Sequence, residues 1–354
     1  MNKNIRVIMN SLLSIGLAFT LGGVFIFASG ENPFATYWVL LSRSLLNPTG
    51  LMNTIHAATP LILTGLAIAV TFKARIYNMG VEGQMLLGGF FAGIIGAYLP
   101  VMNSFLLKSL AIVTAVVCGM LFALIPAILK VKFKVNELVV TLMLNYVVLS
   151  VLEFLATGVF RDYDSGFVAT PTISQAAMFV RFGRTRLTAF TLITLLVLIG
   201  MFIMFRYSKF GYEIKAFGKN PEFAEASGMR MGRKIIYMML LSGGLAGLAG
   251  AGVMLSDQFK FTLGFSGTPG IGWDGMLVSL LGAHSPIGIL IAAIFYASLK
   301  TGSDHINMFT NVPSEIISLI QGLIILFLAV HFMNKRTSFI KKWKSRKEVK
   351  PSCN

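Results

Sequence analysis

The sequence has few charged residues, and acidic residues are the scarcest of them. Asp, Glu, Lys and Arg make up 12% of the 354 residues and hydrophobic residues 55%, whereas an average soluble domain is about 25% charged. Long uncharged stretches add to this contrast, because they approach the length that a bilayer-spanning helix requires. The composition therefore argues against a water-soluble protein and indicates an integral membrane protein.

Cysteine and histidine are also scarce, and the common nucleotide-binding and hydrolytic motifs are absent. Cys118 lies in an apolar stretch and Cys353 in the polar tail, so a structural disulfide between them is implausible. No G-x-x-x-x-G-K-[ST] motif occurs, so the chain does not bind ATP through a P-loop. Neither H-E-x-x-H nor G-x-S-x-G occurs, and the four histidines are scattered. The sequence predicts no catalytic residue, metal site or cofactor on this chain.

The charged residues that are present are mainly basic. There are 30 Lys and Arg against 14 Asp and Glu, which gives a net charge of +16. In a soluble protein this excess would suggest nucleic-acid binding. Here the basic residues form short clusters between apolar stretches, as in the cytoplasmic loops of membrane proteins. We therefore expect membrane lipid as a partner and no nucleic acid.

Hydrophobic segments predict an all-α, polytopic transmembrane bundle of about ten spans, because a spanning helix needs about 20 mainly apolar residues. Two of the segments are short and are separated by His284, Ser285 and Pro286, so they form either one broken helix or a tight helical pair. The segments are 6–29, 51–72, 80–99, 104–129, 137–158, 187–206, 235–256, 274–283, 286–300 and 314–333.

The positions of Lys and Arg predict the orientation. Lys3 and Arg6 place the N-terminus in the cytoplasm, and the basic tail 335–354 places the C-terminus there as well. Both ends can be cytoplasmic only if the two short segments cross the membrane separately. Residues 1–334 then form the transmembrane domain, with a cytoplasmic loop at 207–233. The loop at 159–186 is predicted to lie outside, although it carries four arginines.

The cytoplasmic loop contains the signals of a short helix. Asn220 is a favourable N-cap, Pro221 suits the first helical position, and Gly228 provides a C-terminal stop. We expect about two helical turns here, with Phe223 and Ala224 on a small apolar patch. The helix is either an ordinary amphipathic segment at the membrane surface or a docking element for a cytoplasmic partner.

Polar residues inside the predicted spans are the candidates for a substrate pathway. Asn78, Glu82 and Gln84 lie at the start of one span, where the helix dipole favours the Glu82 carboxylate. Asn145 lies well inside another span and either bonds to a neighbouring helix or lines the pathway. Glu153 has the same two possible roles as Asn145. Asp274 is an acidic residue at the outer start of the broken segment.

A run of small residues, SGGLAGLAGAG at 242–252, contains Gly243 and Gly247 as a G-x-x-x-G pair. Small residues at this spacing allow two membrane helices to approach closely. The run therefore predicts a tightly packed helix–helix contact.

Several segments, in order along nearly the whole chain, resemble bacterial ABC importer permeases of the branched-chain amino acid, sugar and nucleoside superfamily. These segments are NMGVEGQMLLGG (78–89), NELVVTLMLNY (136–146), GYEIKAFGKNPEFAEASGM (211–229), SGGLAGLAGAG (242–252) and GWDGMLVSLLGAHSPIGILIAAIFYASLKTG (272–302). Residues 58–84 and the long outer loop are most similar to permeases for nucleosides and simple sugars.

The resemblance implies a multi-pass permease subunit in the bacterial cell membrane. It implies pairing with a second permease chain, cytoplasmic ATPase subunits that bind ATP and Mg²⁺, and an extracytoplasmic substrate-binding lipoprotein. The family's ATPase-coupling segment corresponds here to Glu213, Gly218, Asn220, Pro221, Ala224, Glu225 and Gly228. This sequence departs from the family pattern at Lys215 and at Ala283, His284 and Ser285, where the family often has other residues.

Two questions about function stay open at this stage. The substrate is expected to be a nucleoside, with a simple sugar as the alternative. A secondary transporter driven by an ion gradient is a different class, but it should show paired intramembrane carboxylates or inverted repeats with broken helices. The sequence has one broken segment and no obvious repeat, so the ATP-driven importer is favoured.

Overall fold

The computed structural model describes residues 3–100, 103–183, 185–267 and 270–309, together with residues 316, 318–320 and 322–323. Within these ranges the chain is helical and has no β-strand, and extended segments pair only in isolated bridges such as Ala169 with Thr262. The chain divides into two compact units, one of residues 48–297 and one of residues 1–47 and 298–354. The all-α prediction is confirmed.

The larger unit contains most of the predicted spans. Its α10 continues into one π-helical turn at Met254–Gln258, and α12 passes from this unit into the smaller one. The helices are α3 (Pro48–Phe72), α4 (Val81–Tyr98), α5 (Ser104–Phe133), α6 (Glu137–Thr157), α7 (Phe190–Tyr207), α8 (Lys209–Lys219), α9 (Pro221–Ala226), α10 (Met231–Val253), α11 (Ile271–Leu281) and α12 (Pro286–Phe309).

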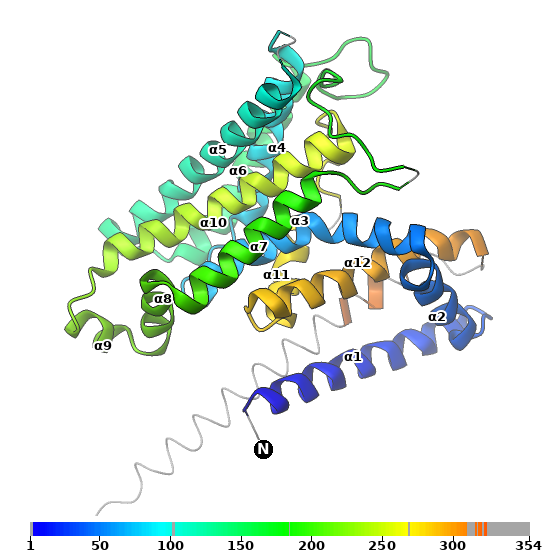
Figure 1. Ribbon diagram of the computed structural model, residues 1–354, viewed down its shortest axis with the longest axis horizontal. Helices are drawn as coiled ribbons and strands as arrows, with labels where there is room; N and C mark the ends of the chain where they lie inside the picture. Colours follow the sequence, from blue (N-terminus) through cyan, green and yellow to red (C-terminus); the bar gives the residue numbers. More distant parts are fainter. Residues whose placement is uncertain are drawn as a thin grey trace, which may run out of the picture. The chain divides into compact units, whose positions relative to one another are not determined.

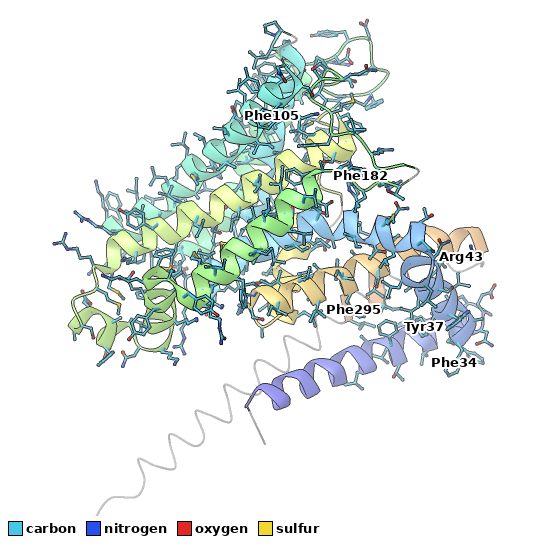
Figure 2. All side chains as sticks on the ribbon, viewed as in Figure 1. Phe34, Tyr37, Arg43, Phe105, Phe182 and Phe295 are labelled. Atoms are coloured by element: carbon cyan, nitrogen blue, oxygen red, sulfur yellow. The ribbon has the colours of Figure 1, made fainter. Side chains whose placement is uncertain are left out.

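The smaller unit begins with α1 (Lys3–Ala28) and α2 (Pro33–Leu41), followed by a π-helical turn at Ser42–Leu46. Asn32 caps α2 by accepting a hydrogen bond from the Phe34 amide at 3.0 Å. The Tyr37 hydroxyl donates to the Phe19 carbonyl at 2.6 Å, which ties α2 to α1; Figure 2 labels Phe34 and Tyr37 on α2. The sequence analysis missed α2, because nine residues are too short to register as a membrane span.

Nine of the ten predicted spans correspond to described helices, and their ends agree to within a few residues except at the end of α12. In the described ranges, seven helices are long and apolar enough to cross a membrane. The two short segments form separate helices, α11 and α12, joined by a tight turn with positive φ at Ala283 and His284. The span predicted at 314–333 lies largely outside the described residues, as does the tail, so the count of ten and the positions of the termini stay predictions.

Glycine-rich packing of α10 forms the core of the larger unit. An added Cβ at Gly243 would lie 2.3 Å from the Gly119 carbonyl oxygen, and one at Gly247 would lie 2.2 Å from the Ala115 oxygen, both on α5. An added Cβ at Gly250 would lie 2.0 Å from the Met85 oxygen on α4. Larger residues would push these backbones apart, so the predicted close contact is confirmed.

The arrangement of the larger unit separates its two polar ends. In Figure 1, α4, α5 and α10 run side by side, as their contacts also show, with α8 and α9 at one end and the loop after α6 at the other. Basic residues such as Lys73, Lys130 and Lys234 gather at the α8–α9 end. By the distribution of positive charge, this end is the one predicted to be cytoplasmic.

Candidate functional site

The cytoplasmic loop predicted at 207–233 folds into two helices that meet at Asn220. The Ser208 hydroxyl starts α8 by accepting from the Gly211 amide at 3.0 Å. Asn220 follows the last residue of α8 and caps α9, since its side chain accepts from the Phe223 amide at 3.1 Å. Pro221 is the first residue of α9, and Gly228 follows the helix with a φ of +80°. The predicted cap and stop are confirmed.

The prediction of a single helix in this loop needs correction. The sequence analysis missed α8, because residues 209–219 contain two glycines and three lysines and have no strong apolar run. The two helices follow α7, which ends at Tyr207, and precede α10, which begins at Met231. The apolar patch of Phe223 and Ala224 was wrong as well: Ala224 is fully buried, whereas Phe223 is 64% exposed.

Close contacts hold α8 against the ends of the membrane helices. An added Cβ at Gly218 would lie 1.9 Å from the carbonyl oxygen of Lys73, just after α3. Glu213 is buried and forms an ion pair with Lys234 at the start of α10, with 2.5 Å between Oε2 and Nζ. The Lys215 ammonium donates to the Phe205 carbonyl on α7 at 2.5 Å. The helix therefore contacts three other elements and has little freedom to move alone.

An ammonium group is enclosed beneath α8. Lys73 Nζ lies 3.8 Å from the centroid of the Phe205 ring, a distance that suits a cation–π interaction. Burial, together with the neighbouring positive charge of Lys215, lowers the pKa of Lys73 to about 8. His284 lies nearby, with its ring centroid 5.6 Å from that of Phe72. Burial and the Lys73 charge lower the pKa of His284 to about 4.

The structure thus sorts the predicted coupling residues into two groups. Glu213, Gly218 and Ala224 are buried, and the first two attach the helices to the rest of the chain. Pro221 and Glu225 are exposed on α9, as are Glu222 and Phe223 between them. The surface that a cytoplasmic partner could contact is therefore the exposed face of α9.

Polar side chains of α6 and α10 hold the non-helical segment that leads into α4. Asn145 donates to the Met79 carbonyl at 2.8 Å and accepts from the Gly83 amide at 3.0 Å. Asn78 donates to Gln84 Oε1 at 3.1 Å and to Ser242 Oγ at 2.9 Å. These groups are buried and satisfy one another and the backbone, so the expected bond between Asn145 and a neighbouring helix is confirmed.

Two residues that sequence reasoning missed complete this polar contact. The Thr141 hydroxyl accepts from the Met79 amide at 3.1 Å, and Ser242 accepts from Asn78. A signal for Thr141 was available, because Glu137, Thr141 and Asn145 are spaced by four residues and so share one face of α6. Glu137 also forms an ion pair with Lys130 of α5, with 2.7 Å between Oε2 and Nζ.

Glu82 lies in the first turn of α4, as predicted, and it also contacts the start of α11. Its Oε2 accepts from the Gly272 amide at 2.6 Å, and Gly270 and Gly272 pack so closely on it that added Cβ atoms would lie 2.7 and 2.6 Å from Glu82 atoms. A carboxylate at a helix N-terminus is favoured by the unpaired amides and the dipole there. Asp274 is buried in the same turn and accepts from the Tyr296 hydroxyl at 2.7 Å.

The five residues predicted to line the pathway are therefore all buried and bonded within the chain. Asn78, Gln84 and Asn145 belong to the contact around the start of α4, and Glu82 and Asp274 to the start of α11. Their role toward a substrate stays a prediction. In the described part of the chain, no group of three or more His, Cys, Asp or Glu residues could hold a metal ion.

The loop at 159–186 covers the opposite end of the larger unit. Its Ser174 amide donates to the Gly96 carbonyl at the end of α4 at 2.9 Å. Its Phe179 amide donates to the Leu255 carbonyl, in the π-helical turn after α10, at 2.8 Å. Figure 2 labels Phe105, at the start of α5, and Phe182, in this loop, and both side chains are at least half exposed. The loop thus packs over several helix ends and leaves apolar groups exposed.

Comparison with known proteins identifies the family. The family model described as "Branched-chain amino acid transport system / permease component" matches residues 50–329. The guanosine ABC transporter permease protein NupP of Bacillus subtilis is 31% identical over 93% of this chain and 95% of its own length. The nucleoside ABC transporter permease protein NupB of Lactococcus lactis is 32% identical over 94% and 93%. The glucose ABC transporter permease protein TsgB13 of Haloferax volcanii is 30% identical over 92% and 88%. The chain is therefore an integral membrane protein that belongs to the branched-chain amino acid transport system permease family.

Proposed function

We propose that this chain is the permease subunit of an ATP-driven nucleoside importer. It forms the translocation pathway together with a second permease chain. Cytoplasmic ATPase subunits dock on the exposed face of α9, and a substrate-binding lipoprotein delivers the solute to the opposite end. ATP and Mg²⁺ bind to the ATPase subunits, which supply the work that this chain converts into a change of access.

The observation that carries the proposal is the attachment of α8 to the membrane helices. The contact of Gly218 with the Lys73 backbone joins α8 to the end of α3, and the Glu213–Lys234 ion pair joins it to α10. A force on α9 would therefore pass to both helices without being absorbed by a flexible loop. An element of this kind suits a subunit whose motor is on another chain.

The comparisons support a nucleoside as the substrate. The relatives named for guanosine and nucleosides, NupP and NupB, are 31% and 32% identical to this chain over more than nine-tenths of its length. The glucose permease TsgB13 follows at 30% identity, so a simple sugar is the second candidate. An ion-gradient-driven mechanism has no support from these relatives, because each is named as an ABC transporter permease.

The test is uptake by the complete importer in proteoliposomes. The complex of this chain with its ATPase, second permease and receptor is supplied with ATP on the ATPase side and with labelled guanosine, uridine or glucose on the other. We expect nucleoside uptake that stops when the ATPase cannot hydrolyse ATP. Glucose uptake without nucleoside uptake would replace the substrate proposal with the sugar alternative. Uptake that follows an ion gradient in the absence of ATP would overturn the proposal itself.

A further inference from the structure

The exposed side of α6 carries a polar stripe in its second half. Tyr146, Ser150, Glu153 and Thr157 are spaced by four, three and four residues, which places them within roughly 60° of one another around the helix. Tyr146 is 65% exposed, Ser150 and Thr157 are exposed, and Glu153 is partly exposed. On the same side, the first half of the helix is apolar, with Val139 and Met143. The stripe therefore runs from the middle of α6 to its predicted outer end.

The exposed sides of α5, which contacts α6, and of α7, the next helix along the chain, differ from this pattern. Between their first and last turns, the exposed positions of both helices are apolar residues or glycine, as expected for surfaces that contact lipid. These positions are Leu110, Val113, Val117, Leu121 and Ile125 on α5, and Leu195, Leu196, Ile199, Gly200 and Ile203 on α7.

The Glu153 carboxylate makes contact with lipid unfavourable. In the described part of the chain, its carboxylate oxygens form no ion pair and no hydrogen bond. The 21 residues of α6 span about 31 Å, and Glu153 lies four residues before the end, about 6 Å inside it. A carboxylate inside a spanning helix is unfavourable in contact with hydrocarbon unless it meets water or a partner.

The polar groups on the buried side of α6 are in a different situation. Glu137, Thr141 and Asn145 have partners within the chain, so the polar groups on that side are already satisfied. The hydroxyls of Tyr146 and Ser150 have no hydrogen-bond partner in the described ranges. A water-filled passage would hydrate these groups and the carboxylate.

We propose that the stripe of Tyr146, Ser150, Glu153 and Thr157 lines the outer half of the translocation pathway. It would contact an uncharged solute that bears a ring and several hydroxyls. The Tyr146 ring offers a stacking surface, and the Glu153 carboxylate accepts hydrogen bonds from solute hydroxyls. The same carboxylate repels phosphorylated forms of the solute. The identity of the solute as a nucleoside rests on the proposed function above, whereas the location of the pathway does not.

Thiol accessibility in the complete importer tests the location. In a background in which Cys118 and Cys353 are replaced, single variants Ser150→Cys and Glu153→Cys are exposed to a charged, membrane-impermeant thiol reagent from the receptor side. Val151→Cys is the matched control, because Val151 is 48% exposed at the same depth of α6 but lies on another side of the helix. We expect the first two variants to be labelled at least tenfold faster than the control, and excess guanosine to slow their labelling.

Two results would overturn the assignment. Labelling of Ser150→Cys no faster than that of Val151→Cys would place the stripe away from water. Spontaneous cross-linking of Ser150→Cys to a cysteine of the second permease chain, without reagent access, would make the stripe a dry subunit contact. If labelling is fast but no nucleoside protects or is transported, the location stands and the proposed substrate fails.

A transport measurement examines the role of the carboxylate. We expect Glu153→Leu to lower kcat/KM for guanosine uptake by roughly tenfold or more, because a hydrogen bond to a charged group is lost. Glu153→Gln should retain more of the activity and should weaken the exclusion of guanosine monophosphate. Unchanged uptake and unchanged exclusion in both variants would refute contact between Glu153 and the solute.

Discussion

The contact between Gly218 and the backbone after α3 offers the sharpest test of the proposal that α8 transmits movement. A Cβ at position 218 would lie 1.9 Å from the Lys73 carbonyl oxygen, whereas ordinary contact begins at 3.4 Å. In Gly218→Ala, α8 would have to move by about 1.5 Å, because the atom it meets is backbone and has no rotamer to change. Overpacking of this kind costs about 1–3 kcal/mol.

This free-energy cost destabilises the arrangement in which α8 packs against the end of α3. A change of 1–3 kcal/mol corresponds to a 5- to 150-fold change in an equilibrium between two states. We therefore expect Gly218→Ala to reduce ATP-driven uptake by about tenfold in the complete importer. Membrane insertion should be normal, because residue 218 lies outside the spanning segments.

The assay compares transport with ATP hydrolysis in the same proteoliposomes, and size-exclusion chromatography verifies that the subunits assemble. Gly200→Ala is the control, since Gly200 lies inside α7 and an added Cβ there meets nothing within 4 Å. If Gly218→Ala assembles and transports as well as Gly200→Ala, then α8 does not act as a rigid connection, and the proposed transmission is refuted.

The remaining predictions concern four other positions. Glu225→Arg on exposed α9 should abolish transport without changing the melting temperature; transport at the original rate with normal ATPase stimulation would contradict the coupling role. Lys234→Ala should lower the free energy of unfolding by about 3 kcal/mol, because the Glu213 carboxylate is left buried without its partner, and Lys234→Arg should restore most of it. Asn145→Leu should lower the free energy of unfolding by about 2 kcal/mol, because the Gly83 amide and the Met79 carbonyl lose their partners. The control Met143→Leu, on the exposed side of α6, should lower it little, and equal melting temperatures of the two variants would refute the prediction. The pKa of His284 is lowered by burial to about 4, so its neutral form stabilises the fold above pH 6.5, and that stability is lost as the pH falls from 6.5 toward 4. Unfolding in detergent across this range should show a loss that is smaller in His284→Gln.

Local signals in the sequence predicted much of the fold. The apolar length of α5 and α6 fixed their ends to within a few residues, because a helix in a bilayer must satisfy its own backbone. Asn220, Pro221 and Gly228 specified the ends of α9 through cap chemistry that acts over three or four residues. Predictions of this kind succeeded because each depends on neighbouring residues alone.

Features that depend on tertiary contact were beyond such reasoning. The helix α8 has no strong apolar run, and contacts with residues distant in sequence, Lys73 and Lys234, hold it in place. Whether an intramembrane polar residue bonds within the chain or faces a passage also depends on what lies opposite. Asn145 and Glu153 occur on one helix eight residues apart, and only the fold distinguishes the bonded amide from the partly exposed carboxylate.

If the stripe lines the pathway as proposed, the two sides of α6 have separate roles, one in packing and one in contact with the solute. The segment that enters α4 is not helical, and the first amides of α4 have no partner within the helix, so these backbone groups need acceptors from other elements. Glu137, Thr141 and Asn145 supply them from one side of α6, which fixes the rotation of that helix. Because helical geometry then sets the direction of every other residue, Ser150 and Glu153 must face away from the bundle. Weakening the buried contact should therefore disturb the exposed stripe. In Asn145→Leu, we expect the difference in labelling between Ser150→Cys and Val151→Cys to shrink even where the protein still assembles, and an undiminished difference would show that the two sides of α6 are independent.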